Sequence, residues 1–237
     1  QAHEAMSPES GMVSLDRLPE LNASAEVRSV NERLAALTGI PVENAEEGYF
    51  SVYNPGYMLQ TLHLDNHHLL FDPWRIASSV IYLGDPFGEK ADADAVDGRT
   101  VFPLLETEGG TPPLPPGEVA AWSARLREQA EAFQPGDDPQ AGRTCTDRDQ
   151  DAACRRLLAH ARSQCEGGTG GALGLRSGDA VVFWNTDASN ELTFRALHGS
   201  CGVPSTSPHA KIVLAKFLRA GPRPWLDQQS FVEARKA

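Results

Sequence analysis

Alternation of apolar and polar residues recurs along most of the chain and predicts a protein built mainly from β-strands. Such alternation turns one face of a strand toward the core and the other toward solvent. Clusters of Gly, Pro and Asn separate the alternating runs, as in a β-sandwich or a jelly roll. The expected strands are 49–53, the segment around 61–65, 75–83, 99–104 with an interruption at Pro103, 179–184, the segment around 198, and 211–218.

A helical period replaces the alternation in residues 24–38. Ser24 can cap the start of this helix, and Gly39 follows where a helix stop is expected. Residues 1–20 are polar and predict irregular structure. The apolar stripe of the helix is expected to face the core and consists of Val27, Val30, Leu34 and Leu37.

The stretch at about 106–170 is an insertion between two expected strands. It contains two amphipathic segments, 117–133 and 151–164, joined by a polar linker, and a Gly-rich run at 167–174 closes it. Burying each large apolar side chain of such a helix contributes about 1.5–3 kcal/mol. We therefore expect the insertion to pack against the strand domain or a partner chain, with a self-contained helical hairpin as the alternative. The two apolar stripes comprise Val119, Trp122, Leu126 and Phe133, and Ala153, Leu157, Leu158 and Ala161.

Length and charge narrow the class of protein. The 237 residues suit one domain spanning 1–237. The net charge of −11 argues against nucleic acid and anionic membranes as partners. No apolar run has the length of a transmembrane helix. The N-terminal stretch lacks the hydrophobic region of a signal peptide, so we expect any targeting segment to lie outside this sequence.

The four cysteines are Cys145, Cys154, Cys165 and Cys201. An even number permits two disulfides with three possible connectivities, and four free thiols in a cytosolic protein are the alternative. The spacings are too wide for the paired cysteines of a zinc site. A glycosylation sequon at Asn22 adds weak support for a secreted protein.

The strongest chemical signal is His63-Leu64-Asp65. Residues two apart on a strand point to the same face, so the imidazole and the carboxylate should converge. Such a pair supplies two of the three ligands of a 2-His-1-carboxylate iron site, and His198 is the candidate for the third. A half-buried strand histidine without a ligand role is the alternative.

The order of motifs resembles the catalytic domain of prolyl 4-hydroxylases, within the Fe(II)/2-oxoglutarate dioxygenases. The resemblance covers about residues 25–220, apart from the insertion. It implies a mainly β fold with flanking helices, a double-stranded β-helix of the jelly-roll, cupin-like type. The matching motifs are Leu37-Thr38-Gly39-Ile40-Pro41, Tyr53 and Gly56 with His63-Leu64-Asp65, Arg75 to Leu83, Gly98 to Pro103, Gly178 to Trp184, and Leu197-His198-Gly199-Ser200-Cys201 followed by Lys211 to Phe217.

The resemblance also implies roles for single residues. His63, Asp65 and His198 would hold Fe(2+). Lys211 would bind the far carboxylate of 2-oxoglutarate, and alternation favours it over Lys216 because residues five apart face opposite ways. The alternative for both lysines is a solvated edge charge.

Three further residues carry roles from the same resemblance. Tyr53 would donate its hydroxyl to the 2-oxoglutarate carboxylate, with ordinary strand packing as the alternative. Arg75 would lie near the peptide groove as a catalytic residue, or else form a surface ion pair. Phe217 stands where the family has a tryptophan near the substrate peptide.

The resemblance implies a peptidyl-proline 4-hydroxylase that uses Fe(2+), 2-oxoglutarate and L-ascorbate on Pro-rich polypeptides in the polyproline II form. It would work in the secretory pathway, in the endoplasmic reticulum or Golgi, membrane-anchored or luminal in the full-length protein. By family position, Cys165 would pair with Cys201, and Cys145 with Cys154. The insertion would shape the rim of the peptide groove or form a subunit contact.

Several positions depart from the family pattern. Tyr57 replaces a glutamine, Gln60 replaces a tyrosine, and Gly202 follows Cys201 in place of proline. These positions border the co-substrate and peptide pockets of the family. The changes therefore bear on the identity of the substrate more than on the binding of iron. Two alternatives therefore stay open: a dioxygenase of the same fold acting on another residue or a small molecule, and a binding or assembly protein without turnover.

Overall fold

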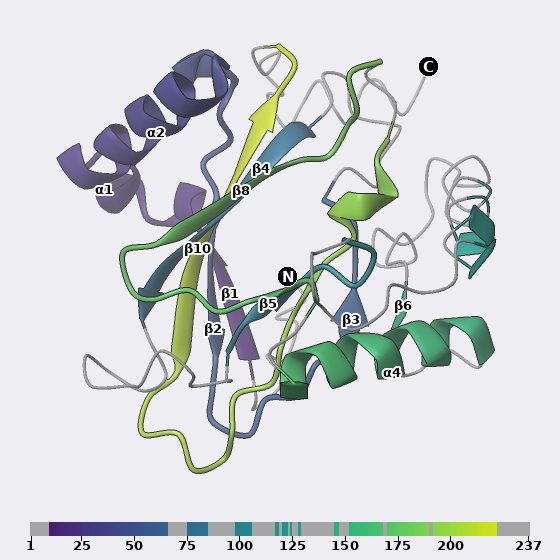
Figure 1. Ribbon diagram of the computed structural model, residues 1–237. Coiled ribbons are helices and arrows are strands. Elements are labelled where there is room, and N and C mark those ends of the chain that lie inside the picture. The colour runs from purple at the N-terminus through teal and green to yellow at the C-terminus, as the bar shows by residue number, and fades with distance from the viewer. Residues whose placement is uncertain are drawn as a thin grey trace, which may run out of the picture.

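The structure, a computed structural model, describes residues 10–65, 75–84, 98–105, 117–118, 120–122, 124, 128, 145–146, 152–167, 170–189 and 192–221. Its largest element is a five-stranded antiparallel sheet (Figure 1). In sheet order the strands are β1 (Ser10–Ser14), β2 (Tyr49–Tyr53), β10 (Lys211–Arg219), β4 (Arg75–Gly84) and β8 (Ala180–Trp184). The strands expected near 49, 75, 179 and 211 are therefore confirmed.

Five short strands form two smaller sheets beside the large one. The first sheet is β7 (Ala172–Leu173), β5 (Thr100–Val101) and β9 (Gly199–Ser200), and the second is β3 (Thr61–Leu62) with β6 (Cys145–Thr146). An antiparallel bridge between His63 and His198 joins the ends of β3 and β9. Mainly antiparallel strands with flanking helices are thus confirmed, whereas the double-stranded β-helix stays a prediction.

The helix α2 (Ala25–Thr38) covers the outer face of the large sheet (Figure 1). Ser24 caps it by accepting a hydrogen bond from the Val27 amide, and Gly39 ends it at a φ of 72°. Both end signals are confirmed. The stripe is narrower than expected, because Leu37 is 71% exposed.

Residues 10–20 are ordered, so the expectation of irregular structure there is wrong. They form β1, a 3-10 turn at Leu15–Arg17 and the short helix α1 (Pro19–Asn22). β1 pairs along its whole length with β2, and Leu15 is fully buried against Val27 and Leu214. Pairing with β2 orders this edge strand, and its sequence, Ser-Gly-Met-Val-Ser, lacks the alternation of polar and apolar residues that marks a strand. A second 3-10 turn, Val42–Asn44, follows α2.

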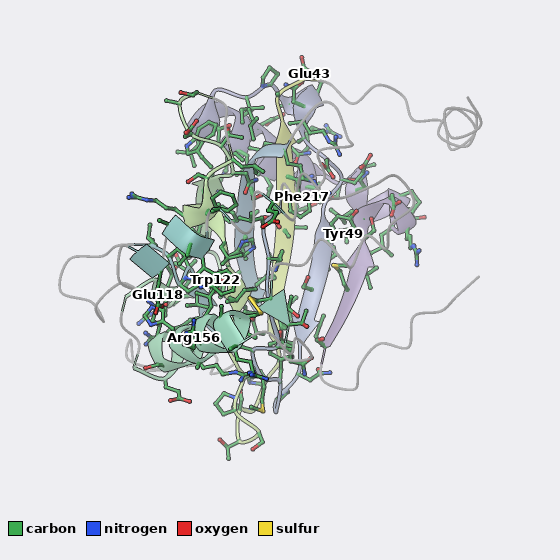
Figure 2. All side chains as sticks on the ribbon, turned by 90° about the vertical axis from the view of Figure 1, so that its right-hand side faces the viewer. Glu43, Tyr49, Glu118, Trp122, Arg156 and Phe217 are labelled. Carbon is green, nitrogen blue, oxygen red and sulfur yellow. A yellow bond between two sulfur atoms is a disulfide. The ribbon has the colours of Figure 1, made fainter. Side chains whose placement is uncertain are left out.

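The insertion packs against the strand domain, as expected, in the part that the structure describes. Its helix α4 (Ala152–Gly167) buries Leu157, Leu158 and Ala161 in one cluster with Leu62 and Leu197. Trp122 joins this cluster from the earlier segment, whose described residues between 117 and 128 are helical (Figure 2). The other members of that segment's stripe, Val119, Leu126 and Phe133, lie outside the described residues.

Two short strands lie where the sequence predicts only linker. β6 falls in the polar linker and pairs with β3, and β7 falls in the Gly-rich run. Arg162 of α4 also donates two hydrogen bonds to the Leu59 carbonyl, at 3.2 and 2.7 Å. The insertion is therefore anchored to the segment that leads into His63.

Both disulfides have the expected pairing. Cys145 bonds to Cys154 and Cys165 bonds to Cys201, and no cysteine is free among these four. The alternative of four free thiols is wrong. None of the described helices has the length and apolar character needed to cross a bilayer.

Replacing Gly171 by Ala is expected to destabilise the fold by about 3 kcal/mol. A Cβ there would lie 2.0 Å from the Phe102 carbonyl oxygen, which belongs to backbone that cannot move aside cheaply. Gly174→Ala is the matched control, since its Cβ would meet nothing closer than Arg99 Nε at 3.5 Å. Urea unfolding measures both variants, and equal stability would contradict the expectation.

Candidate metal centre

Three potential ligands converge between the large sheet and the short strands. One ligand atom from each of His63, Asp65 and His198 lies within 4.8 Å of the others. Asp65 Oδ1 is 3.4 Å from His63 Nε2, and Asp65 Oδ2 is 3.7 Å from His198 Nε2. The structure thus brings together the three residues that the sequence singles out as ligands.

Strand alternation explains how this cluster forms. Leu62 and Leu64 are buried in the hydrophobic core beside α4. His63 and Asp65 alternate with these leucines along the chain, so their side chains face the opposite way. His198 arrives opposite His63 through two backbone hydrogen bonds of 2.9 and 3.0 Å between these two residues. His63 and His198 are far apart in the sequence, and this antiparallel bridge places them side by side.

A hydrogen bond fixes the orientation of the His198 ring. Its Nδ1 lies 2.9 Å from the Ala196 carbonyl, which can only accept, so Nδ1 carries the proton. The Nε2 lone pair is then free and faces Asp65. A backbone partner on the other ring nitrogen is typical of histidines that bind metals.

The protonation states suit a cation. Burial lowers the pKa of His198 to about 4, so its imidazole is neutral at pH 7. Burial would raise the pKa of Asp65, but His198, His63 and Ser78 together hold it well below its usual value. The cluster therefore offers one carboxylate and neutral imidazole nitrogen, the donor set of non-haem iron oxygenases.

The cluster is closed on one side and open on another. The rings of Phe102 and Phe183 lie 5.5 and 4.8 Å from the His198 ring and shield it from solvent. The His63 side chain is 39% exposed. A bound metal would thus keep positions that a small molecule can reach.

A buried cation lies near this cluster. Lys211 is 1% exposed, and its ammonium donates to Ser200 Oγ at 2.9 Å and to the Arg99 carbonyl at 3.3 Å. Among the described residues no carboxylate pairs with it. Burial lowers the pKa of Lys211 to about 7. An unpaired buried ammonium is costly, so the site suits an anionic ligand.

Two tyrosine rings enclose the Lys211 ammonium. It lies 5.1 Å from the Tyr53 ring and 4.9 Å from the Tyr82 ring. Tyr53 pairs with Lys211 across β2 and β10, and its hydroxyl interacts with Ser51 and Ser200. Burial raises the pKa of Tyr53, so its hydroxyl remains a donor at neutral pH.

Lys216 faces the other side of β10. Its ammonium donates to the carbonyls of Glu46 and Glu47, whereas Lys211 reaches the short strands. Lys216 is also 1% exposed. The alternative of solvated edge charges is therefore wrong for both lysines.

Arg75 forms an ion pair with Glu46 that is partly buried, not the surface ion pair that was the alternative. It makes two hydrogen bonds to the Glu46 carboxylate, at 2.7 and 2.8 Å, and donates to the Asp65 carbonyl at 3.2 Å. Its guanidinium lies 3.8 Å above the Phe217 ring, which neighbours Tyr49 (Figure 2). Arg219 shares the same carboxylate at 2.8 Å.

Glu46, Ser200 and Arg219 take part in the site without a local sequence signal. Glu46 acts through Arg75 and Arg219, which are 29 and 173 residues away, and Ser200 acts through Lys211 on the next strand. His67 and His68, expected in a solvated loop, lie outside the described residues.

Comparison with known proteins gives distant structural likenesses. No family model and no curated protein matches the chain. A viral collagen prolyl hydroxylase from Paramecium bursaria Chlorella virus 1, in a 2OG complex, is 16% identical with a TM-score of 0.42, over 92% of this chain and 82% of that one. EvdO2 from Micromonospora carbonacea var. aurantiaca, complexed with 2-oxoglutarate, is 15% identical with a TM-score of 0.43, over 93% and 74%. Likenesses this distant assign no role to the residues of this chain. The chemistry of the site is therefore inferred from the side chains described above.

Proposed function

We propose that this chain is an Fe(II)- and 2-oxoglutarate-dependent dioxygenase that hydroxylates proline in Pro-rich polypeptides. The observation that carries the proposal is the convergence of His63, Asp65 and His198 in a site that also holds the buried Lys211, which no carboxylate of the described residues pairs with. The donor set suits Fe(II), and the cation suits a co-substrate that carries two carboxylates.

His63, Asp65 and His198 would hold the iron. Together with 2-oxoglutarate the iron would supply oxidative chemistry, in which O2 would give one oxygen atom to succinate and one to the substrate with release of CO2. Phe102 and Phe183 keep bulk water from the His198 side. The Ala196 carbonyl holds the His198 proton on Nδ1, so that Nε2 stays available as a ligand atom.

Lys211 would bind the far carboxylate of 2-oxoglutarate, which supplies the missing counter-charge. Ser200 and the Arg99 carbonyl already orient the ammonium. Tyr53 would add a hydroxyl donor to the same carboxylate. L-Ascorbate as an accompanying reductant follows only from the resemblance of the sequence.

Phe217 and Arg75 are proposed to contact the substrate peptide. Arg75 is stacked on Phe217 and held by both oxygens of Glu46, so these two side chains form a rigid surface. A proline-rich chain in the polyproline II conformation suits a rigid surface, because it has little conformational entropy left to lose on binding.

The location and the architecture complete the proposal. Two disulfides fit an oxidising compartment, which supports a secreted or luminal protein. The proposed location within the secretory pathway is the endoplasmic reticulum or Golgi. The sheets would form a double-stranded β-helix. The insertion would shape the rim of the peptide groove or provide a subunit contact.

Succinate release with and without Pro-rich peptides tests the proposed function. Release that depends on a proline-containing peptide, and is lost when alanine replaces the prolines, supports prolyl hydroxylation. Release that requires another substrate indicates a dioxygenase of different specificity. If Fe(II) and 2-oxoglutarate bind but no screened substrate yields succinate, a binding protein without turnover replaces the enzyme.

The affinity for 2-oxoglutarate is expected to fall about tenfold per pH unit between pH 7.5 and 8.5. The free Lys211 has a pKa of about 7 and loses its proton above this pH, whereas the bound carboxylate requires the protonated form. Below pH 7 the affinity should level off, because Lys211 is already protonated. Calorimetric titration of Co(II)-loaded protein measures this, and an affinity that stays constant up to pH 8.5 would contradict it.

A further inference from the structure

Two adjacent buried serines of β4 have different surroundings. Ser78 is 1% exposed and pairs across the sheet with Phe183 and Phe217, on the face that carries the metal centre. Ser79 is 0% exposed and lies on the opposite face, where its hydroxyl has no hydrogen-bond partner among the residues that the structure describes. Only Ser78 belongs to a chain of polar side chains.

That chain begins at Asn185, directly after β8. Asn185 Nδ2 donates to Ser78 Oγ at 2.8 Å, and Asn185 is 1% exposed. Its backbone is fixed on both sides, since its amide donates to the Ile76 carbonyl at 2.8 Å and its carbonyl accepts from Thr193 at 3.0 Å. The amide group therefore has little freedom to turn.

The single proton of the Ser78 hydroxyl limits the hydrogen bonds that it can donate. Ser78 Oγ accepts from Asn185, so its single proton is available for another acceptor. Ser78 lies between Phe183, whose ring is 4.8 Å from that of His198, and Phe217, on which the Arg75 guanidinium stacks while it donates to the Asp65 carbonyl. Burial would raise the pKa of Asp65, and Ser78 is one of the groups that lower it. A carboxylate can only accept, so the free Ser78 proton is of the kind that the Asp65 carboxylate needs.

We propose that Ser78 and Asn185 are positioning residues of the metal centre. Asn185 orients the Ser78 hydroxyl, which holds the Asp65 carboxylate with one oxygen toward His63 and the other toward His198. Rotation of a carboxylate about its last torsion is otherwise soft. The inference rests on the proposed metal centre and goes beyond its three ligands.

Metal titration of serine variants tests the inference. Ser78→Ala is expected to weaken Co(II) binding by about 10- to 100-fold, the usual effect of losing a partner of a metal ligand. Ser78→Thr keeps the hydroxyl and should bind Co(II) nearly as the wild type does. Ser79→Ala is the matched control: it removes a buried hydroxyl without a partner, so both Co(II) affinity and stability should be preserved.

A double-mutant cycle separates positioning from a general loss of structure. Asn185→Ala should weaken Co(II) binding by acting through Ser78, so the Ser78→Ala/Asn185→Ala variant should bind no more weakly than Ser78→Ala alone. The absorption bands of bound Co(II) should change in Ser78→Ala and stay unchanged in Ser79→Ala.

Three outcomes would overturn the inference. Equal Co(II) affinities for Ser78→Ala and Ser79→Ala would remove Ser78 from the metal centre. Additive losses in the cycle would show that Asn185 does not act through Ser78. Wild-type protein that binds no Co(II) would refute the proposed metal centre as well, whereas wild-type binding without turnover would leave the positioning role intact and refute only the enzyme.

Discussion

Replacing His198 by Ala is expected to abolish tight metal binding and turnover. The substitution removes one of three converging donors and leaves one oxygen of the buried Asp65 carboxylate without the imidazole that faces it. We expect the affinity for Fe(II) or Co(II) to fall by more than about 100-fold, beyond the loss caused by removing an outer partner of a ligand. His63→Ala and Asp65→Ala should behave in the same way.

Anaerobic calorimetry with Fe(II) measures the metal affinity, and succinate release measures turnover. His209→Ala is the histidine control, because the His209 side chain is exposed in the segment before β10. This control should bind metal like the wild type. Full activity of His198→Ala would show that the three converging residues are not the ligands.

Replacing Lys211 by Ala is expected to raise the 2-oxoglutarate requirement by about 100-fold or more, since breaking one side of a buried ion pair costs about 3–5 kcal/mol. The variant would leave the far carboxylate of the co-substrate buried without a cation. The metal affinity should change much less, because no ligand atom belongs to Lys211.

Lys216→Ala provides the matched control for Lys211. It removes a lysine of the same strand and the same exposure, but one that donates to the Glu46 and Glu47 carbonyls. We expect it to lower stability and to leave the 2-oxoglutarate requirement nearly unchanged. A larger effect of Lys216→Ala on that requirement would contradict the assignment of faces on β10.

Local periodicity accounts for the parts of the fold that the sequence predicts well. The helix of 24–38 carries its own cap and stop, and the long strands β4 and β10 carry enough alternation to be recognised. His63 and Asp65 are two apart on one strand, so their convergence is a local property as well. His198 is a candidate from its residue type, and the family resemblance strengthens the assignment, because nothing local links it to residue 63.

Other features depend on partners that a single sequence does not reveal. β1 and β6 become strands by pairing with β2 and β3. Glu46 meets Arg219 across a separation of 173 residues. Ser78 and Ser79 look identical in the sequence, and only the sheet shows which of them faces the metal centre.

The two disulfides have a consequence for the order in which the chain assembles. Cys145 and Cys154 are 9 residues apart, so their bridge closes a short loop that can form while the rest of the chain is still unfolded. Cys165 and Cys201 are 36 residues apart, and β7, β8 and the His198 segment lie between them. In the unfolded chain the longer loop costs about 1 kcal/mol more to close. The second bridge is therefore favoured once folding has brought Cys165 and Cys201 together, and it then holds the segment of His198 beside α4.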